Sequence, residues 1–237
     1  MKGMILAAGF GTRLQPMTNI MPKALVEVNG HTLLELAIKK LLKADIDEII
    51  VNVHHFADQI VQYLNENDFG VKIHISDERD VLLGSGGGLK HAQSFLDGDE
   101  PFLVYNVDVI SNIDLLDMQY LYQNSSALAI LAVRKRETER YLCFDNDHRL
   151  RGWKNIKSGE QKGEDGHAYA FSGIQLLHPG LLNRMPEGNF NIIDFYLEVV
   201  KTGTILAYDH SDGEWLDVGT MERLKKANSL VKNIEGL

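Results

Sequence analysis

The chain has 237 residues, of which 44% are hydrophobic and 24% are charged, and its formal net charge is −9. These are the length and composition of one globular domain with a full core, and the negative charge argues against nucleic acid or an anionic membrane as the main partner. Because Cys143 is the single cysteine, the chain can form neither an internal disulfide nor a cysteine-based metal site.

The apolar start of the chain ends at Gly9, which is too early for a signal peptide. No later run approaches the ~20 apolar residues that a membrane span needs. We therefore expect a cytoplasmic protein without membrane contact, acting as a monomer or a homodimer.

Strand-like and helix-like segments alternate in the first half of the chain. Short apolar runs predict strands and amphipathic segments predict helices, and Thr32 followed by Glu35 has the spacing of a helix capping box. This order predicts an α/β fold with a doubly wound, mostly parallel, Rossmann-like sheet, which binds ligands beyond the carboxyl ends of its strands. The predicted strands are 3–8, 48–53, 71–75 and 102–107, and the predicted helices are 32–45, 57–67 and a segment that follows the glycine-rich loop 84–88 and ends at Phe95.

The second half of the chain is less regular, and its pattern predicts a smaller α+β portion. The polar, glycine-rich segment 158–166 predicts a mobile excursion. No linker and no internal repeat divides the chain, so we predict one domain, 1–237. The predicted strands here are 128–133, 141–144, 173–177 and 204–208, and the predicted helices are 191–203 and 220–233.

A long loop, 9–23, follows the first predicted strand at the ligand edge of the sheet. Its start, GFGTRL, departs from the dinucleotide-binding fingerprint because Leu14 replaces the third glycine, and the chain has no P-loop motif. Glycine lets a backbone approach a phosphate closely, and Arg13 and Lys23 add two positive charges. We interpret the loop as a lid with a flexible root that closes over phosphates. The alternative is a solvated surface loop with incidental charges.

Two carboxylates stand where an α/β sheet binds ligands. Asp108 directly follows the fourth predicted strand, and Asp217 precedes the last predicted helix. They lie far apart in the sequence, so spacing alone does not bring them together. The alternative for each is a helix cap or a turn residue.

Residues 9–23, GFGTRLQPMTNIMPK, resemble the signature of the sugar-1-phosphate nucleotidyltransferases, G-x-G-T-R-L-x-P-x-T followed by P-K, at every fixed position. The resemblance extends along nearly the whole chain, through the glycine-rich loop, the aspartate after the fourth strand and WLDVGT at 215–220. The segments 84–89 and 171–182 look most like the short, single-domain branch. That branch includes N-acetylmuramate-1-phosphate uridylyltransferases and related mannose- and heptose-phosphate enzymes.

The resemblance implies an activity: an NTP and a sugar 1-phosphate give an NDP-sugar and pyrophosphate, with uridylyl or guanylyl transfer favoured. It also implies a nucleotide-binding part at about 1–110, a sugar-binding part at about 111–237 and a role in nucleotide-sugar biosynthesis for the cell envelope. A sugar phosphate is mostly dianionic at neutral pH, so the reaction needs no general base. Positioning and charge neutralisation would then carry catalysis.

The family pattern also implies the residues of the site. Asp108 and Asp217 would hold Mg²⁺, which favours one or two carboxylates together with water and phosphate oxygens. Arg13 and Lys23 would be catalytic and hold the triphosphate and the leaving pyrophosphate. The implied nucleotide-binding residues are Leu6, Ala7, Ala8, Gly9, Gly11, Thr12, Arg13, Lys23, Ser85 and Gly86, and the implied substrate-binding residues are Asn106, Lys154, Ser172 and Gly173.

Some positions depart from the family pattern. The family often has its sugar-phosphate lysine in an E-K-P motif; this chain lacks the motif and offers Lys154, with Lys157 as a competitor. Val107 and Leu142 stand where many members have glycine. Both changes put the identity of the sugar in doubt more than the class of reaction.

Other functions stay open at this point. A cytidylyltransferase of a non-sugar phosphate such as phosphocholine would need an aromatic cage with acidic residues. A non-catalytic sugar-nucleotide sensor could lose Arg13, Lys23 or an aspartate without penalty, yet all are present. A dinucleotide-dependent oxidoreductase is disfavoured by Leu14 and by the late first helix. His54 and His55 are interpreted as structural.

Overall fold

The first half of the chain forms the parallel part of the sheet, which confirms the predicted fold class. The computed structural model describes residues 1–233. Its parallel strands follow the order β6-β1-β4-β5, with helices in the crossovers. These elements are β1 (Lys2–Leu6), α1 (Leu33–Leu42), β4 (Glu48–Val53), α2 (Ala57–Glu66), β5 (Lys72–Asp77), α3 (Gly84–His91), α4 (Gln93–Leu96) and β6 (Phe102–Asn106).

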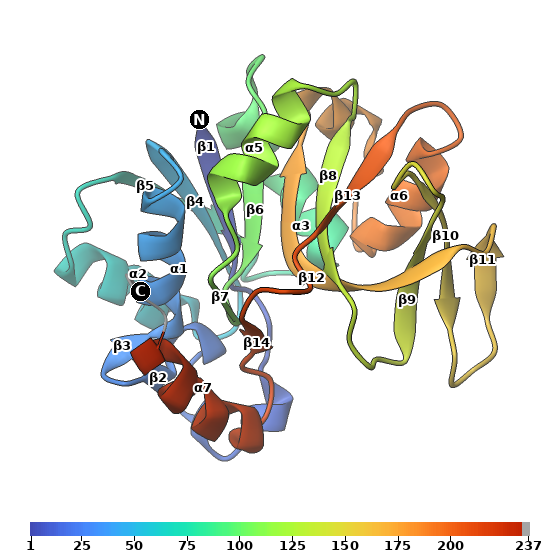
Figure 1. The fold of residues 1–237 in the computed structure, drawn as a ribbon. Helices are drawn as coiled ribbons and strands as arrows, with labels where there is room; N and C mark the ends of the chain where they lie inside the picture. Colours follow the sequence, from blue (N-terminus) through green and yellow to red (C-terminus); the bar gives the residue numbers. More distant parts are fainter. Residues whose placement is uncertain (234–237) are drawn as a thin grey trace.

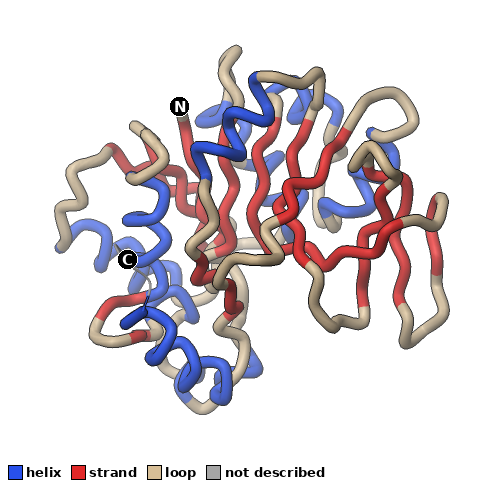
Figure 2. The backbone as a smooth tube through the Cα atoms, viewed as in Figure 1, coloured by secondary structure: helices blue, strands red, loops and turns tan. Residues whose placement is uncertain are grey.

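The second half extends the same sheet through a long strand, β12 (His167–Leu177), which pairs antiparallel with β6. Within residues 1–233 the sheet has ten strands, and Figure 2 shows them running side by side through the molecule with helices around them. The strands added here are β8 (Ala129–Arg134), β9 (Arg140–Phe144), β10 (Leu150–Asn155), β11 (Gln161–Gly163) and β13 (Ile205–Asp209).

The predicted excursion at 158–166 is wrong, because part of it is strand β11, paired with β10. The glycines in this region serve a close approach of backbones rather than mobility. A Cβ at Gly152 would lie 2.1 Å from the carbonyl oxygen of Glu164, and Gly163 has a φ of +72°. Polar, glycine-rich composition therefore marks a tight hairpin here.

Several short elements escape the sequence pattern. The short strands β7 (Val109–Ser111) and β14 (Trp215–Asp217) form an antiparallel pair beyond the end of β6, as do β2 (Glu27–Val28) and β3 (His31–Thr32) beside it. The remaining helices are α5 (Leu115–Gln123), α6 (Ile192–Val199), α7 (Met221–Asn233) and the 3₁₀ turns Thr12–Leu14, Met17–Asn19, Lys23–Leu25 and Pro179–Arg184.

Helix α1 shows why the local predictions worked. The Thr32 hydroxyl accepts a hydrogen bond from the Glu35 N–H at 3.0 Å, which is the expected N-cap. The Glu35 carboxylate does not return to Thr32 but pairs with His31 and Lys39. The apolar stripe of the helix lies buried against the sheet.

Both faces of the sheet are buried, as a doubly wound fold requires. Met4 and Ile5 are adjacent in β1 and fully buried, yet they belong to different apolar clusters because successive side chains point to opposite faces. Helices α1, α2 and α5 supply one cluster, and α3, α4 and α6 supply the other. In Figure 1 the carboxyl ends of β1 and β6 point down toward β7 and β14. The helices among residues 1–233 include none that is long and apolar enough to cross a membrane.

Candidate functional site

A cavity of about 290 Å³ opens beyond the carboxyl ends of β1 and β6, at the edge of the sheet where the sequence predicts a site. It brings together the segment after β1, the start of α3 and the segment after β6. Its lining residues are Leu6, Ala7, Ala8, Gly9, Lys23, Asn52, Leu82, Gly84, Ser85, Asn106, Val107 and Asp108.

The later part of the loop 9–23 is packed, whereas Gly9 and Phe10 at its start are exposed, and the flexible root stays a prediction. Leu14 and Ala24 are fully buried, and the Thr18 hydroxyl donates a hydrogen bond to the Gly11 carbonyl at 2.9 Å. Gly11 has a φ of +64°, and a Cβ there would lie 2.9 Å from Cβ of Lys23. The start of the loop therefore supports its end, and Lys23 reaches the cavity from a fixed base.

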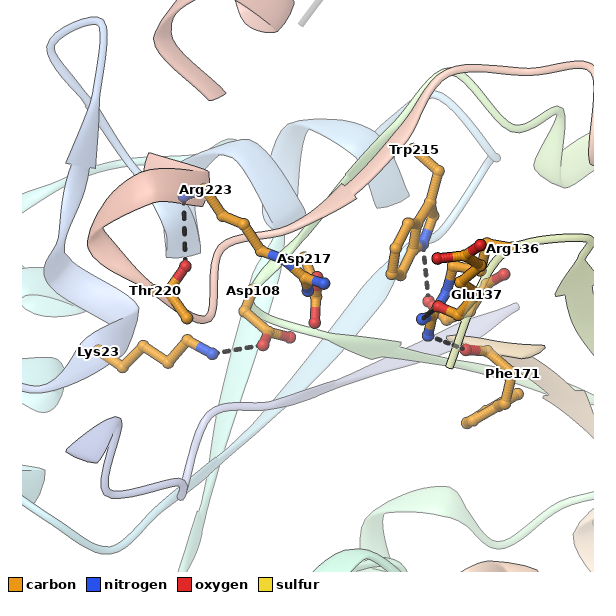
Figure 3. A network of polar contacts seen from close by, with 10 residues as sticks. Lys23, Asp108, Arg136, Glu137, Phe171, Trp215, Asp217, Thr220 and Arg223 are labelled. Atoms are coloured by element: carbon orange, nitrogen blue, oxygen red, sulfur yellow. Dashed lines mark hydrogen bonds and ion pairs between the residues drawn. The ribbon is translucent and has the colours of Figure 1, made fainter. Parts of the chain in front are cut away.

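Asp108 and Asp217 come together because β7 pairs with β14. The backbone N–H of Val218 donates to the Asp108 carbonyl at 2.7 Å, and Asp217 stands opposite Val109 in the register. Lys23 forms an ion pair with Asp108, and Arg223 forms one with Asp217 (Figure 3). Both carboxylates stay about one fifth exposed, so a ligand can reach them.

These two carboxylates fit a hard cation such as Mg²⁺. Residues 1–233 contain no group of three or more histidine, cysteine, aspartate and glutamate side chains that could hold a metal. A cation on Asp108 and Asp217 would therefore take its other ligands from water and from substrate phosphates, which is how Mg²⁺ is usually held.

Arg13 lies on the Asp217 side of the site and does not line the cavity. A Cβ at Gly219 would lie 3.0 Å from Nη2 of Arg13, so the guanidinium rests on the turn after β14. Gly11 and Thr12 also lie outside the cavity lining. Of the predicted loop residues, Gly9 and Lys23 face the cavity.

The glycine-rich segment 84–88 is the first part of α3 rather than a loop before it. Ser85 lines the cavity, and its hydroxyl accepts a hydrogen bond from the Ile192 N–H at 3.1 Å, which ties α3 to α6. Gly86 does not line the cavity. A Cβ there would lie 2.1 Å from the Phe190 ring, so this glycine permits packing of the protein against itself.

A buried polar network supports the floor of the cavity and was not predicted. The Asn52 side chain accepts from the Ala7 N–H and donates to Glu78, both at 2.7 Å. Glu78 is 3% exposed, and it also accepts from the Leu83 N–H at 3.3 Å. The sequence signal that could have revealed this network is Asn52, a polar residue inside the largely apolar strand β4. His54 contacts the Glu78 carbonyl, which agrees with a structural role.

A second cavity, of about 510 Å³, shares Leu6, Ser85 and Asn106 with the first. It extends along the second half of the sheet toward α6, and its lining contains both aromatic and charged side chains. Its other lining residues are Arg136, Thr138, Arg140, Tyr141, Leu142, Trp153, Asn155, Glu160, Lys162, Phe171, Gln175, Asn191, Ile192, Ile193 and Asp194.

Lys154, the predicted cation for the sugar phosphate, does not line this cavity. Successive side chains of a strand point to opposite faces, so Trp153 lines the cavity while Lys154 turns away. Lys154 Nζ lies 2.6 Å from Asp165, and this hydrogen bond raises the pKa of Lys154. Lys157 pairs with Glu139 outside the cavity. The lysine that the sequence missed is Lys162, opposite Trp153 in β11.

Ser172 does not line the second cavity and is fully buried. Its hydroxyl lies 2.7 Å from Nε2 of His210, and its carbonyl accepts from the Trp215 indole N–H at 2.9 Å. Burial, with a smaller effect from Arg134, lowers the pKa of His210 to about 4.

Gly173 supports the site indirectly. It has a φ of +78°, and a Cβ there would lie 2.7 Å from the Asn106 amide nitrogen. Its lack of a side chain leaves room for Asn106, which lines both cavities as predicted.

Comparison with known proteins agrees with this geometry. Residues 2–234 match the family model described as Nucleotidyl transferase. The chain is similar to N-acetylmuramate alpha-1-phosphate uridylyltransferases from Neisseria meningitidis (31% identity; 97% of this chain, 98% of the relative) and Caulobacter vibrioides (30%; 91% and 90%).

Among solved structures, the fold resembles an inositol-1-phosphate CTP transferase from T. maritima, with a TM-score of 0.81 over 100% of this chain and 97% of that one. At 18% identity this likeness supports the fold alone. The packed loop, the paired aspartates and the family match lead to one assignment. The chain belongs to the Nucleotidyl transferase family.

Proposed function

We propose that this protein transfers a nucleotidyl group from an NTP to a sugar 1-phosphate, releasing pyrophosphate and forming an NDP-sugar. The observation that carries the proposal is that Lys23 and Asp108 line the first cavity as an ion pair, while the pairing of β7 with β14 brings Asp217 next to Asp108. The named substrates of the relatives support the reaction class.

The two cavities divide the substrates between them. The first, with Ala7, Gly9 and Ser85 in its lining, suits the nucleoside. The triphosphate would then lie toward Lys23 and Arg13. The second cavity, with its polar and aromatic lining, suits the sugar. Asp108 lines the first cavity and has Asp217 beside it. Together they would hold Mg²⁺, which would neutralise negative charge on the phosphate oxygens.

The chemistry is a displacement at the α-phosphorus. An oxygen of the sugar phosphate forms a bond to this atom, and the bond to the bridging oxygen of the β-phosphate breaks, so that pyrophosphate leaves with the electron pair. The nucleophile is already ionised at neutral pH, and no side chain has to remove a proton. Lys23 and Arg13 would bind the charge that develops on the leaving group.

The phosphocholine alternative meets an obstacle in the second cavity. Trp153 and Asp194 offer the aromatic face and the carboxylate that a quaternary ammonium group would use. Lys162 already occupies both, with Nζ 5.5 Å from the centroid of the Trp153 ring and 2.8 Å from Asp194. The geometry therefore favours a sugar.

Release of pyrophosphate tests the proposal. We would incubate the purified protein and Mg²⁺ with each NTP and a panel of sugar 1-phosphates, starting with UTP and N-acetylmuramate 1-phosphate because relatives carry those names. We expect release with one pair, dependent on both substrates and lost with EDTA. Phosphocholine with CTP is the control. Release with that pair, or none with any sugar phosphate, would contradict the proposal.

A further inference from the structure

The basic side chains that line the second cavity are Arg136, Arg140 and Lys162, and they differ in their exposure and in their ion-pair partners. Lys162 is neutralised by Asp194 at 2.8 Å and Glu160 at 3.6 Å. Arg140 is exposed at the mouth of the cavity. Arg136 forms no ion pair with a carboxylate of the described chain.

Arg136 is also poorly satisfied by hydrogen bonds. Its Nη1 and Nη2 donate to the carbonyls of Glu137 and Phe171 at the long distances of 3.3 and 3.4 Å. Its Nε is buried and finds no hydrogen-bond partner within residues 1–233. A partly buried guanidinium with weak contacts retains most of its capacity to bind an anion.

A stack on Trp215 fixes the position of Arg136. The guanidinium carbon lies 4.7 Å from the centroid of the indole ring, within the range of a cation–π contact. The indole is itself held by the Ser172 carbonyl. In strand β14, Trp215 and Asp217 project to the same side, so the stack stands beside the carboxylate (Figure 3).

The surroundings of Arg136 are positively charged. Arg134 lies 5.7 Å from the same indole ring, and burial, together with the charges of Arg223 and Arg134, lowers the pKa of Arg136. A cation in this position is stabilised when an anion joins it. The side of Arg136 that faces the second cavity is where such an anion can enter.

We infer that Arg136 is the residue that binds the phosphate of the sugar 1-phosphate, in the role that the sequence assigned to Lys154. This inference rests on the proposed function. A guanidinium can bind two phosphate oxygens at once through its planar fork. A phosphate between Arg136 and the two aspartates would lie where the nucleophile has to stand, and Trp215 would act as a positioning residue for Arg136.

The kinetic test compares Arg136→Gln with Arg149→Gln, a matched loss of one charge at an exposed arginine that lines neither cavity. We expect R136Q to raise KM for the sugar 1-phosphate at least tenfold while KM for the NTP changes less than twofold, and R149Q to change both less than twofold. Arg136→Lys, which keeps the charge but loses the fork, should fall between them. An unchanged KM for the sugar phosphate in R136Q would overturn the inference.

A binding test separates this inference from the proposed function. The chain has two tryptophans, so Trp153→Phe leaves Trp215 as the single fluorophore beside Arg136. Inorganic phosphate, added without NTP, should change this emission in a saturable way, with at least tenfold weaker binding after R136Q and little change after R149Q. If the wild type transfers no nucleotide but W153F shows this binding pattern, the proposed function fails and Arg136 remains an anion site. Equal binding by W153F with and without R136Q, or no binding by W153F, would overturn the inference.

Discussion

At the scale of single residues, Asp108 and Asp217 are each paired with a basic side chain, and each carboxylate stays about one fifth exposed. A ligand can therefore reach both carboxylates, although most of each side chain is buried.

Asp108→Asn and Asp217→Asn should therefore separate activity from stability. Each should lower kcat at least ~100-fold, since a lost metal ligand removes several kcal/mol of charge stabilisation. The free energy of unfolding should fall by at most about 3 kcal/mol, because the amide keeps the shape of the carboxylate and only the partly buried charged contact is lost. Steady-state kinetics and urea unfolding measure the two effects. Full activity in either variant would remove that residue from the proposed metal site.

Lys154 and Lys162 form a second contrast between neighbouring lysines. Lys154→Ala should leave both KM values unchanged and cost less than about 1 kcal/mol, because its pair with Asp165 lies outside the cavities and is partly exposed. Lys162→Ala should raise KM for the sugar phosphate about tenfold, since it removes a charged hydrogen-bond donor from the cavity. A raised KM in Lys154→Ala together with an unchanged KM in Lys162→Ala would contradict the placement of these side chains on β10 and β11.

The residues that sequence reasoning placed well share one property: their position follows from a local motif. Gly9 and Asp108 directly follow predicted strands, Lys23 ends the loop after the first of them, and the parallel sheet gathers strand ends at one edge. Lys154 lies outside the cavity lining because the side that it faces depends on strand register, and β10 carries an irregularity between Leu150 and Gly152. The role of Arg136 depends on a stack with a residue 79 positions away, which no local pattern encodes.

At the scale of elements, glycines in the two glycine-rich segments serve two purposes, packing and ligand access. Gly86 in α3 faces Phe190, whereas Gly9 after β1 has open space around it and lines the first cavity. The sequence shows both as glycines near a ligand edge. Their surroundings decide whether the missing side chain serves packing or binding.

Gly86→Ala and Gly9→Ala should consequently give opposite results. Gly86→Ala should destabilise the protein by about 1–3 kcal/mol, because its methyl group would overlap the Phe190 ring. Gly9→Ala should leave the unfolding midpoint nearly unchanged but raise KM for the NTP. Thermal unfolding and kinetics on both variants check this. A stable, fully active Gly86→Ala would show that α3 can move away from Phe190.

The junction of β12, β13 and β14 predicts a pH dependence. His210 follows β13 and is buried in its neutral form, with a pKa lowered to about 4, and an unfolded histidine titrates near its usual 6.5. The unfolded state therefore binds more protons between these values. The contribution of His210 to stability is complete above pH 6.5 and is lost as the pH falls toward 4, up to about 3 kcal/mol in total.

Urea unfolding between pH 4 and 8 measures this dependence. His210→Gln should flatten the decline below pH 6.5, and His167→Gln, at an exposed position, should keep the wild-type slope. If His210→Gln also keeps that slope, another buried group controls the acid sensitivity.

At the scale of the whole molecule, the site lies where the parallel part of the sheet meets the antiparallel part. Both cavities contain Leu6 from β1 and Asn106 from β6, and β12 pairs with β6 at this boundary. Regular alternation along the sequence predicted the parallel part, because each crossover is local. The antiparallel part depends on pairings between distant segments, such as β12 with β6, and the separate β7–β14 pair is equally distant in sequence. Sequence alone left these pairings open.

Helix α7, near the C-terminus, also contributes to the site. It supplies Arg223 to Asp217, and Asn228 accepts two hydrogen bonds from Asn29, which lies between β2 and β3. Elements from both ends of the chain thus hold the two aspartates in one place, which makes the site a property of the complete fold.

The most direct test of nucleotidyl transfer follows the phosphorus atoms. The active NTP would be labelled with ³²P at either the α- or the γ-phosphate, and the products from the sugar 1-phosphate would be separated. For nucleotidyl transfer we expect the α-label in the NDP-sugar and the γ-label in pyrophosphate. Transfer of γ-label to the sugar, or release of γ-label as inorganic phosphate with α-label in free NDP, would contradict it.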